Sequence, residues 1–309
     1  MTYLELSAMT RARLDELGSV GEAWRADLDE IVGALCSKWG LNVEGSFMGG
    51  SASLVVGTAT SDGFESTLKV FIPRGGSGYG EYERELAALR RGGPGYVALL
   101  DADEGVRAML LERLGSPLGN SDLAVEQKID IIEATLSSAW SDAPNADGFL
   151  TGAEQAQGLI AFIEAEAPGS PLERDIAARA IELAGRRCNA FNPSTSVLIH
   201  GDGHEMNVLA AHGQPGTYRL IDPEPMVSSR EHDLALPLRD WSATVLAGDS
   251  VAIGQEWCRR ISAPSGADAK AVWEWVRVER VTTGLLMSRL GNPQAGPMLE
   301  VARRWILSS

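Results

Sequence analysis

The sequence predicts an α+β protein in which a strand-rich first part is followed by a mainly helical second part. Five short apolar runs of strand-like composition fall within the first 115 residues, whereas the apolar positions after Ser116 recur at helical spacing. Hydrophobic residues make up 44% of the 309-residue chain, which is enough for a sizeable core. We therefore expect two lobes, an N-lobe of residues 1–115 and a C-lobe of residues 116–309.

The N-lobe is predicted to begin with a helix from Gly21 to Trp39, which carries one apolar stripe and ends at Gly40. The predicted strands that follow are Leu41–Phe47, Ser53–Ala59, Glu65–Ile72, Tyr96–Leu100 and Val106–Leu111. A helix from Tyr79 to Arg91 separates the third strand from the fourth. We expect the strands to form one sheet with this helix packed against it.

Two features of the N-lobe fit phosphate binding. Gly49, Gly50 and Ser51 lie in the turn MGGSAS, where small residues let backbone N–H groups approach a phosphate, although a tight hairpin would give the same pattern. Lys69 lies inside the apolar strand STLKVF, where its ammonium can reach phosphates and pair with Glu85 of the next helix. The alternative for Lys69 is a strand lysine on the solvent face.

The C-lobe is predicted to be helical around one irregular stretch, which runs from Val197 to Asp233. The predicted helices are Asp122–Trp140, Gly152–Glu166, Pro171–Arg187, Glu231–Leu246 and several pieces within Val251–Leu307. The irregular stretch contains the predicted short strands Val197–Ile199, Val208–Ala211 and Tyr218–Ile221.

Polar residues of this stretch have the spacing of the protein-kinase catalytic loop. Asp202 follows the first short strand, Asn207 comes five residues later, and Asp222 ends the last strand. In such a loop one carboxylate meets the acceptor hydroxyl, while an amide and a second carboxylate hold magnesium. The alternative is a turn-rich hairpin whose polar side chains only cap backbone groups. By the same comparison, Glu112 to Leu114 take the place of a kinase hinge, whose backbone hydrogen-bonds adenine.

The chain resembles the aminoglycoside phosphotransferase-like small-molecule kinases, above all their streptomycin 6-kinase and hydroxyurea phosphotransferase branch. The resemblance rests on GGSASLVV at residues 49–56, LKV at 68–70, VALLDADEGVRAMLLERL at 97–114, HGDGHEMNVLA at 200–210 and the following LIDPEP. Gly203 departs from the family, which has an apolar residue there, so we expect a more flexible loop at that point.

The resemblance implies a bilobal protein-kinase-like fold, with an antiparallel N-lobe sheet, a mainly helical C-lobe and the nucleotide between them. It implies ATP and Mg²⁺ as cofactors, with Asp202 as the catalytic base, Asn207 and Asp222 as magnesium ligands, and Lys69 as the phosphate-binding lysine. The implied reaction transfers the γ-phosphate of ATP to a hydroxyl of an antibiotic-like molecule such as streptomycin, which inactivates the antibiotic.

Charge and composition restrict the partners. A formal net charge of −15 repels nucleic acid and favours a cationic small molecule, although an acidic surface also keeps a protein soluble. The candidate acids for a cationic acceptor are Glu231, Asp233 and Asp240, which follow the metal aspartate closely. Asp233 has a competing role, because the resembled branch keeps an aspartate there that would cap a helix or brace the catalytic loop.

The absence of a long apolar run or an apolar leader predicts a cytoplasmic protein that does not bind a membrane, and we expect a monomer or dimer. The three cysteines are far apart and odd in number, which predicts no disulfide framework and fits a reducing compartment.

Two other functions stay open on the residues alone. His200, Asp202 and His204 alternate along an extended segment, as the ligands of a metal-dependent hydrolase would. The second is a nucleotide-binding pseudokinase without catalysis. The presence of the lysine, both aspartates and the asparagine together argues against it.

Overall fold

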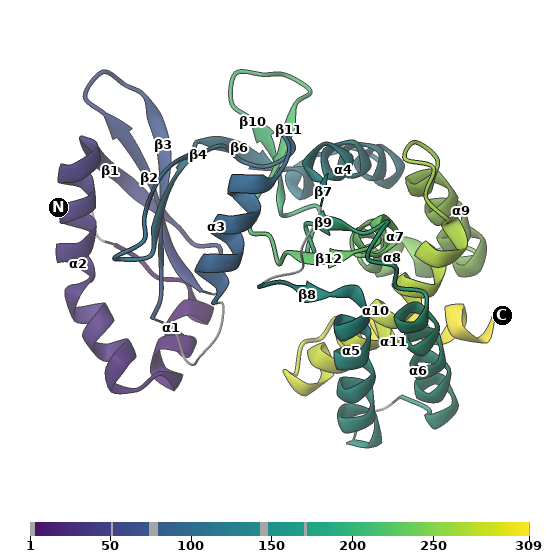
Figure 1. The fold of residues 1–309 in the computed structure, drawn as a ribbon. Helices are drawn as coiled ribbons and strands as arrows, with labels where there is room; N and C mark the ends of the chain where they lie inside the picture. Colours follow the sequence, from purple (N-terminus) through teal and green to yellow (C-terminus); the bar gives the residue numbers. More distant parts are fainter. Residues whose placement is uncertain (1–3, 51, 74–79, 143–147, 170–171, 309) are drawn as a thin grey trace. The chain divides into compact units, whose positions relative to one another are not determined.

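The computed structural model describes residues 4–50, 52–73, 80–142, 148–169 and 172–308. The chain divides into two units, of which the first comprises residues 1–91, 97–115 and 211–216. The second comprises residues 92–96, 116–210 and 217–309. Strands dominate the first unit and helices the second, as the sequence predicts (Figure 1).

The first unit is built on an antiparallel sheet with the strand order β1-β2-β3-β5-β4. Its strands are β1 (Leu41–Phe47), β2 (Ser53–Thr60), β3 (Glu65–Phe71), β4 (Leu99–Asp103) and β5 (Ala108–Glu112). The predicted strand Tyr96–Leu100 was wrong in its position, because β4 begins at Leu99 and continues into the acidic sequence DAD. An edge strand has one side open to solvent, so it accommodates acidic residues that a central strand would not.

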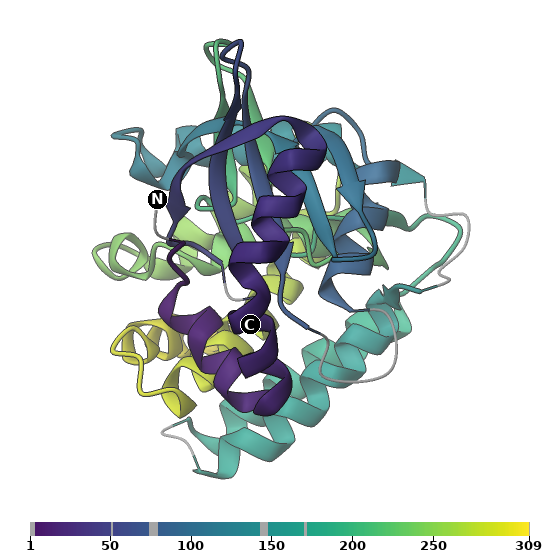
Figure 2. The same ribbon diagram turned by 90° about the vertical axis from the view of Figure 1, so that its left-hand side faces the viewer.

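Two helices cover opposite faces of this sheet (Figure 1). The helix α2 (Ser19–Trp39) lies across one face, where Leu28 and Val32 pack with Val56 in one apolar cluster (Figure 2). It ends at Gly40 in the left-handed conformation, as predicted. On the other face, α3 (Glu81–Arg91) packs the Tyr82 ring edge-on against Phe71.

The helix α1 (Ala8–Glu16) was not predicted. Its only buried residues are Thr10 and Leu14, so it lacks the apolar stripe that identifies a helix from sequence. Its N-cap is Ser7, whose side chain accepts a hydrogen bond from the Thr10 backbone N–H.

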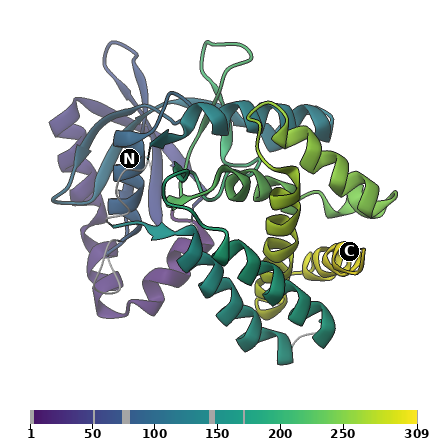
Figure 3. The same cartoon turned by 45° about the vertical axis from the view of Figure 1, so that its right-hand side comes forward.

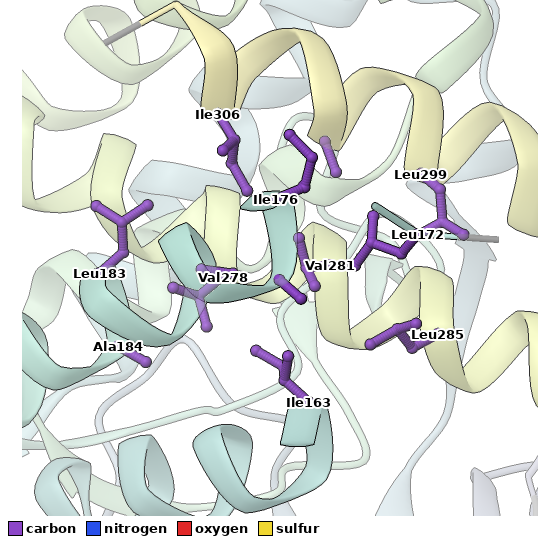
Figure 4. Packing of buried hydrophobic residues seen from close by; sticks show 13 residues of the cluster. Ile163, Leu172, Ile176, Leu183, Ala184, Val278, Val281, Leu285, Leu299 and Ile306 are labelled. Atoms are coloured by element: carbon purple, nitrogen blue, oxygen red, sulfur yellow. The ribbon is translucent and has the colours of Figure 1, made fainter. Parts of the chain in front are cut away.

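The second unit has a helical core. Its longer helices are α4 (Val125–Ala139), α5 (Gly152–Glu166), α6 (Arg174–Asn189), α9 (Ser250–Ser262), α10 (Ala269–Arg289) and α11 (Ala295–Leu307). Figure 3 shows α5 and α6 lying side by side. Their buried residues, among them Ile163 and Leu183, pack with Val281 of α10 and Ile306 of α11 in one cluster (Figure 4).

The predicted helix Glu231–Leu246 was wrong, because the segment is broken into shorter pieces. These are α7 (Arg230–Ala235), the 3₁₀ turn η3 (Pro237–Arg239) and α8 (Ser242–Leu246). Pro237 has no N–H to continue α7, and Trp241 has a φ of 57°, which a helix cannot contain.

The irregular stretch contains β9 (Val197–Ile199), β10 (Val208–Ala211) and β11 (Tyr218–Leu220), as predicted. The strands β7 (Ser141–Asp142), β8 (Leu150–Thr151) and β12 (Met226–Ser228) were not predicted, and they form a sheet with β9 in the order β7-β9-β12-β8. A further sheet has the order β11-β10-β6, with β6 at Leu114–Pro117. The remaining 3₁₀ turns are η1 (Leu118–Asn120) and η2 (Ala167–Gly169).

Two further findings concern the length and polarity of the helices and the state of the cysteines. In the described part of the chain, every helix is too short or too polar to cross a lipid bilayer. The cysteines Cys36, Cys188 and Cys258 all carry free thiols.

We expect the helical core of the second unit to carry much of its stability. Leu183→Ala removes a fully buried side chain and should lower the free energy of unfolding by about 2–5 kcal/mol. The matched control is Leu290→Ala, because Leu290 is 71% exposed at the end of α10 and its loss should change that free energy by less than about 0.5 kcal/mol. Urea unfolding of both variants tests this, and equal losses would contradict the assignment of the core.

Candidate active site

A buried ion pair joins Lys69 of β3 to Glu85 of α3. The Lys69 Nζ donates to both carboxylate oxygens of Glu85 at 2.7 Å. Lys69 and Glu85 are only 6% and 5% exposed. The backbone of Lys69 is held between Val55 of β2 and Met109 of β5, so the lysine occupies the middle of the sheet. The predicted pair is confirmed, and the alternative of a solvent-facing lysine is wrong.

The other residues predicted to bind nucleotide lie at two places in the first unit. Gly49 and Gly50 lie in the turn between β1 and β2, whereas Ser51 falls outside the described residues. Glu112 ends β5 and Leu114 begins β6. The Glu112 side chain accepts a hydrogen bond of 2.8 Å from the Ala98 N–H, so its carboxylate secures the chain ahead of β4. The adenine contact at the backbone of Glu112 to Leu114 stays a prediction.

In the second unit, the side chains of Asp202 and Asn207 are bonded to each other. The Asn207 Nδ2 donates to the Asp202 backbone carbonyl at 2.9 Å and to its Oδ2 at 3.2 Å. Arg239 donates from Nη2 to the other carboxylate oxygen, Oδ1. The His204 Nε2 lies 3.5 Å from Asp202 Oδ2. Both oxygens of the Asp202 carboxylate are therefore held in place.

These contacts keep the Asp202 carboxyl group ionised. Burial alone would raise the pKa of the carboxyl, but the contact with His204 and the charge of Arg239 outweigh it, so the pKa of Asp202 lies below its ordinary value. Burial would likewise lower the pKa of His204, but its contact with the Asp202 carboxylate raises that pKa above the ordinary value. An ionised carboxylate is available to accept a hydrogen bond from an incoming hydroxyl.

Asp222 lies on a segment that is tied to Asn207. The N–H of Ile221, the residue before Asp222, donates to the Asn207 carbonyl at 3.0 Å. The His200 Nε2 lies 3.0 Å from the Ile221 carbonyl oxygen. Asp222 itself has a φ of 54°, a left-handed conformation that aspartate tolerates better than most residues. The fold thus brings the backbones of the two predicted metal ligands together.

Asp233 holds the predicted catalytic loop, residues 200–207, from inside the protein. Its carboxylate is fully buried and accepts hydrogen bonds from the backbone N–H groups of His200 and Gly201 at 3.0 and 2.9 Å. The indole N–H of Trp140 donates to the same carboxylate at 2.7 Å. A carboxylate used in this way does not face an acceptor, so the choice of Asp233 as a substrate-binding acid is corrected to the bracing role that the sequence left open.

The other two candidate acids differ in their surroundings. Asp240 directly follows Arg239 and is partly buried. Burial raises the pKa of its carboxyl, and the positive charges of Arg239 and His204 oppose this rise. Asp240 therefore belongs to the surroundings of the catalytic loop. The Glu231 Oε1 instead accepts a hydrogen bond of 3.2 Å from the N–H of Asp268, the N-cap of α10.

The histidines of this segment serve the loop and do not form a metal cluster. His200 is fully buried, with Nε2 at the Ile221 carbonyl and Nδ1 accepting from the Asp202 N–H at 3.1 Å. The His204 Nδ1 accepts from the Met206 N–H at 3.2 Å. Among the residues that the structure describes, no group of three or more His, Cys, Asp or Glu side chains could hold a metal ion. Because the protein itself uses both ring nitrogens of His200, this histidine does not act with Asp202 and His204 as the ligand set of the hydrolase alternative.

Two contacts of the loop were missed or misjudged from the sequence. Arg239 was missed because it lies far from Asp202 along the chain, and its one local signal is a cation two residues after the helix-breaking proline. At Gly203, a side chain would come within 2.7 Å of the Leu136 side chain of α4. Leu136, which is fully buried, thus fills the space that a side chain at residue 203 would occupy, while the expected flexibility of the loop stays a prediction.

Comparison with known proteins identifies the relatives of the chain. The family model described as aminoglycoside/hydroxyurea antibiotic resistance kinase matches residues 38–291. The chain is 32% identical to a streptomycin 6-kinase of Streptomyces griseus over 75% of this chain and 74% of that protein. It is 30% identical to a hydroxyurea phosphotransferase of Kitasatospora aureofaciens over 70% of this chain and 62% of that protein.

Among solved structures, the choline kinase LicA of Streptococcus pneumoniae superimposes with a TM-score of 0.59 at 14% identity, over 91% of this chain and 99% of that chain. This likeness shows the fold, and the predicted protein-kinase-like fold is confirmed.

We predict that Arg239 controls the titration of Asp202. Arg239→Gln removes a positive charge beside the carboxylate, so the pKa of Asp202 should rise. A ¹³C NMR titration of the Asp202 carboxyl group measures this directly. The control is Arg260→Gln, which removes an arginine from an exposed ion pair with Asp130 and should leave that titration unchanged. An Asp202 titration that is the same in Arg239→Gln and the wild type would contradict the role of Arg239.

Proposed function

The chain belongs to the aminoglycoside/hydroxyurea antibiotic resistance kinases, and from this premise we propose that it transfers the γ-phosphate of ATP to a hydroxyl of a cationic antibiotic such as an aminoglycoside. Transfer of this kind inactivates the antibiotic and gives resistance. The observation that carries the proposal is the Asp202–Asn207 pair, which is bonded internally and tied through Ile221 to the segment of Asp222. A pseudokinase would have no need of this complete set.

In this proposal, residues 1–115 bind the nucleotide. Lys69, oriented by Glu85, contacts the α- and β-phosphates, and the turn at Gly49, Gly50 and Ser51 contributes backbone N–H groups. The burial of the Lys69–Glu85 pair supports this assignment, because a buried ammonium keeps its charge only beside a partner. The backbone of Glu112 to Leu114 hydrogen-bonds the adenine.

Residues 116–309 carry the catalytic loop, the metal ligands and the acceptor. Asn207 and Asp222 suit Mg²⁺, because the Asn207 amide nitrogen is used by Asp202 and leaves the amide oxygen as a ligand, and Asp222 supplies a carboxylate. Bound Mg²⁺ neutralises charge on the transferring phosphate. Asp202 accepts a hydrogen bond from the acceptor hydroxyl, orients it in line and then takes its proton.

Arg239 sets the character of Asp202 as a base. Because its charge helps to hold the pKa of Asp202 low, the carboxylate is a weak base, which suits a loose transition state in which the hydroxyl proton leaves late. Most of the rate acceleration then comes from positioning and charge stabilisation.

The acceptor is a small cationic molecule in this proposal. The formal net charge of −15 supports it, and so do Asp240 beside the catalytic loop and Glu231 at the start of α7. We place the reaction in the cytoplasm, where ATP is available and the free thiols stay reduced, with the protein acting as a monomer or dimer independently of nucleic acid and membranes.

The role of Asp202 is tested with Asp202→Asn, assayed with ATP, Mg²⁺ and streptomycin. The substitution removes the proton acceptor, so phosphoryl transfer should fall by roughly 10²- to 10⁴-fold, while ATP affinity stays close to that of the wild type. The control is Asp249→Asn, because Asp249 only caps α9 and asparagine caps a helix equally well. Wild-type turnover in Asp202→Asn would remove this residue from the mechanism.

The metal assignment predicts unequal effects at the two ligands. Asp222→Ala removes a charged ligand and should weaken Mg²⁺-dependent ATP binding more than Asn207→Ala, which removes a neutral one. Calorimetric titrations with ATP, with and without Mg²⁺, measure the difference. If the wild type binds ATP equally well in both conditions, the two residues do not hold a metal.

The charge of the acceptor is tested through salt. If carboxylates attract a cationic acceptor, its KM should rise with ionic strength as the Debye length falls to about 8–10 Å and below. Glu231→Gln with Asp240→Asn should raise KM for the acceptor more than it lowers kcat. The control is Glu256→Gln, an exposed acid of α9. A KM that is flat from low to high salt would overturn the cationic acceptor and leave the kinase assignment intact.

A further inference from the structure

The N-terminal helix α1 is hydrogen-bonded to the turn between β1 and β2 that contains Gly49 and Gly50, here called the glycine turn. The Ser7 hydroxyl donates to the Gly50 carbonyl at 2.7 Å. The Thr10 Oγ1 lies 3.3 Å from the Ser53 carbonyl oxygen and 2.9 Å from Ser7 Oγ. The hydroxyl of the N-cap Ser7 and that of Thr10 in α1 thus reach one carbonyl within the turn and one at the start of β2.

These contacts are built into the interior of the first unit. Thr10 is fully buried and Ser7 is 5% exposed, so water does not compete with either hydroxyl. Leu14, on the next turn of α1, is fully buried in the cluster that contains Trp24 and Leu28 of α2. The helix is therefore anchored to the unit independently of its contacts with the turn.

The helix α1 lies outside the part of the chain that matches the family model, which begins at residue 38. The glycine turn lies inside that part. We propose that Ser7 and Thr10 are positioning residues, which hold the glycine turn in the conformation that receives the phosphates of the nucleotide. This inference rests on the proposed binding of phosphate by the turn. It adds that a helix outside the matched region supports the turn.

The physical reason is the freedom of glycine. Gly50 has a φ of 90°, a conformation that glycine adopts readily. Because glycine also adopts many other conformations, a turn that nothing else holds would lose much conformational entropy on binding a phosphate. A hydrogen bond from Ser7 limits that freedom before the ligand arrives. It also keeps the Gly50 carbonyl directed at α1, so that its oxygen does not rotate toward a phosphate and repel it.

The test compares nucleotides in the full-length protein by calorimetry. Thr10→Val keeps the shape of the buried side chain and removes the hydroxyl, and Ser7→Ala removes the other hydroxyl together with the N-cap. Each variant should bind ATP and ADP about 3- to 10-fold more weakly, which is the range for one lost hydrogen bond. Adenosine affinity and the KM for the acceptor should not change, because neither ligand contacts the turn through phosphate.

Matched variants separate positioning from general stability. Thr10→Ser and Ser7→Thr keep the hydroxyls and should restore ATP affinity. Ser37→Ala removes a hydroxyl that bonds the Gly33 carbonyl within α2, and it should leave ATP affinity unchanged. Unchanged ATP affinity in the double variant Ser7→Ala/Thr10→Val would overturn the inference, as would an equal fall in ATP and adenosine affinity. If the wild type does not bind ATP at all, the proposed function of the turn fails, and this inference with it.

Discussion

The catalytic loop depends on one buried carboxylate, that of Asp233. It accepts hydrogen bonds from the backbone N–H groups of His200 and Gly201 and from the Trp140 indole. Without it, two buried backbone N–H groups would lose their partner, at about 1–3 kcal/mol for each unsatisfied group, and the half-buried indole would lose its acceptor as well. The geometry at Asp202 follows from this brace, because the residues that precede Asp202 are fixed from inside the protein. The position of Asp202 thus depends on a second acid, Asp233, which lies far from it along the chain.

A break in a helix connects the fold to the electrostatics of the site. Pro237 ends α7, and the 3₁₀ turn that follows carries Arg239, whose guanidinium bonds the Asp202 carboxylate. An uninterrupted helix over this segment would direct residue 239 along the helix surface. The same turn leads into Asp240, whose backbone carbonyl accepts from the buried Arg280 at 2.6 Å. The segment after Asp222 thus carries a charged group that contacts Asp202, and its sequence does not indicate this contact.

The sequence was sufficient for several features that have a local signal. Strand-like runs located most of the first sheet, and a lysine inside an apolar strand predicted its pairing with Glu85. The spacing of Asp202 and Asn207 predicted a catalytic-loop pattern, and the structure adds that the two side chains are bonded to each other. Arg239, the brace at Asp233 and the contacts of Ser7 with Gly50 join residues more than thirty positions apart, and no periodicity marks such pairs. The helix α1 escaped detection for a related reason, since it is held by two hydroxyls and one leucine.

As a small-molecule kinase, the protein should join a phosphate to a hydroxyl of an antibiotic. Incubating the purified protein with ATP, Mg²⁺ and a panel of antibiotics, and following the phosphorus by ³¹P NMR, tests it most directly. With a true acceptor, a new phosphomonoester signal should grow in step with ADP, one for one. Release of inorganic phosphate at the same rate with and without every acceptor, with no phosphomonoester formed, would contradict it.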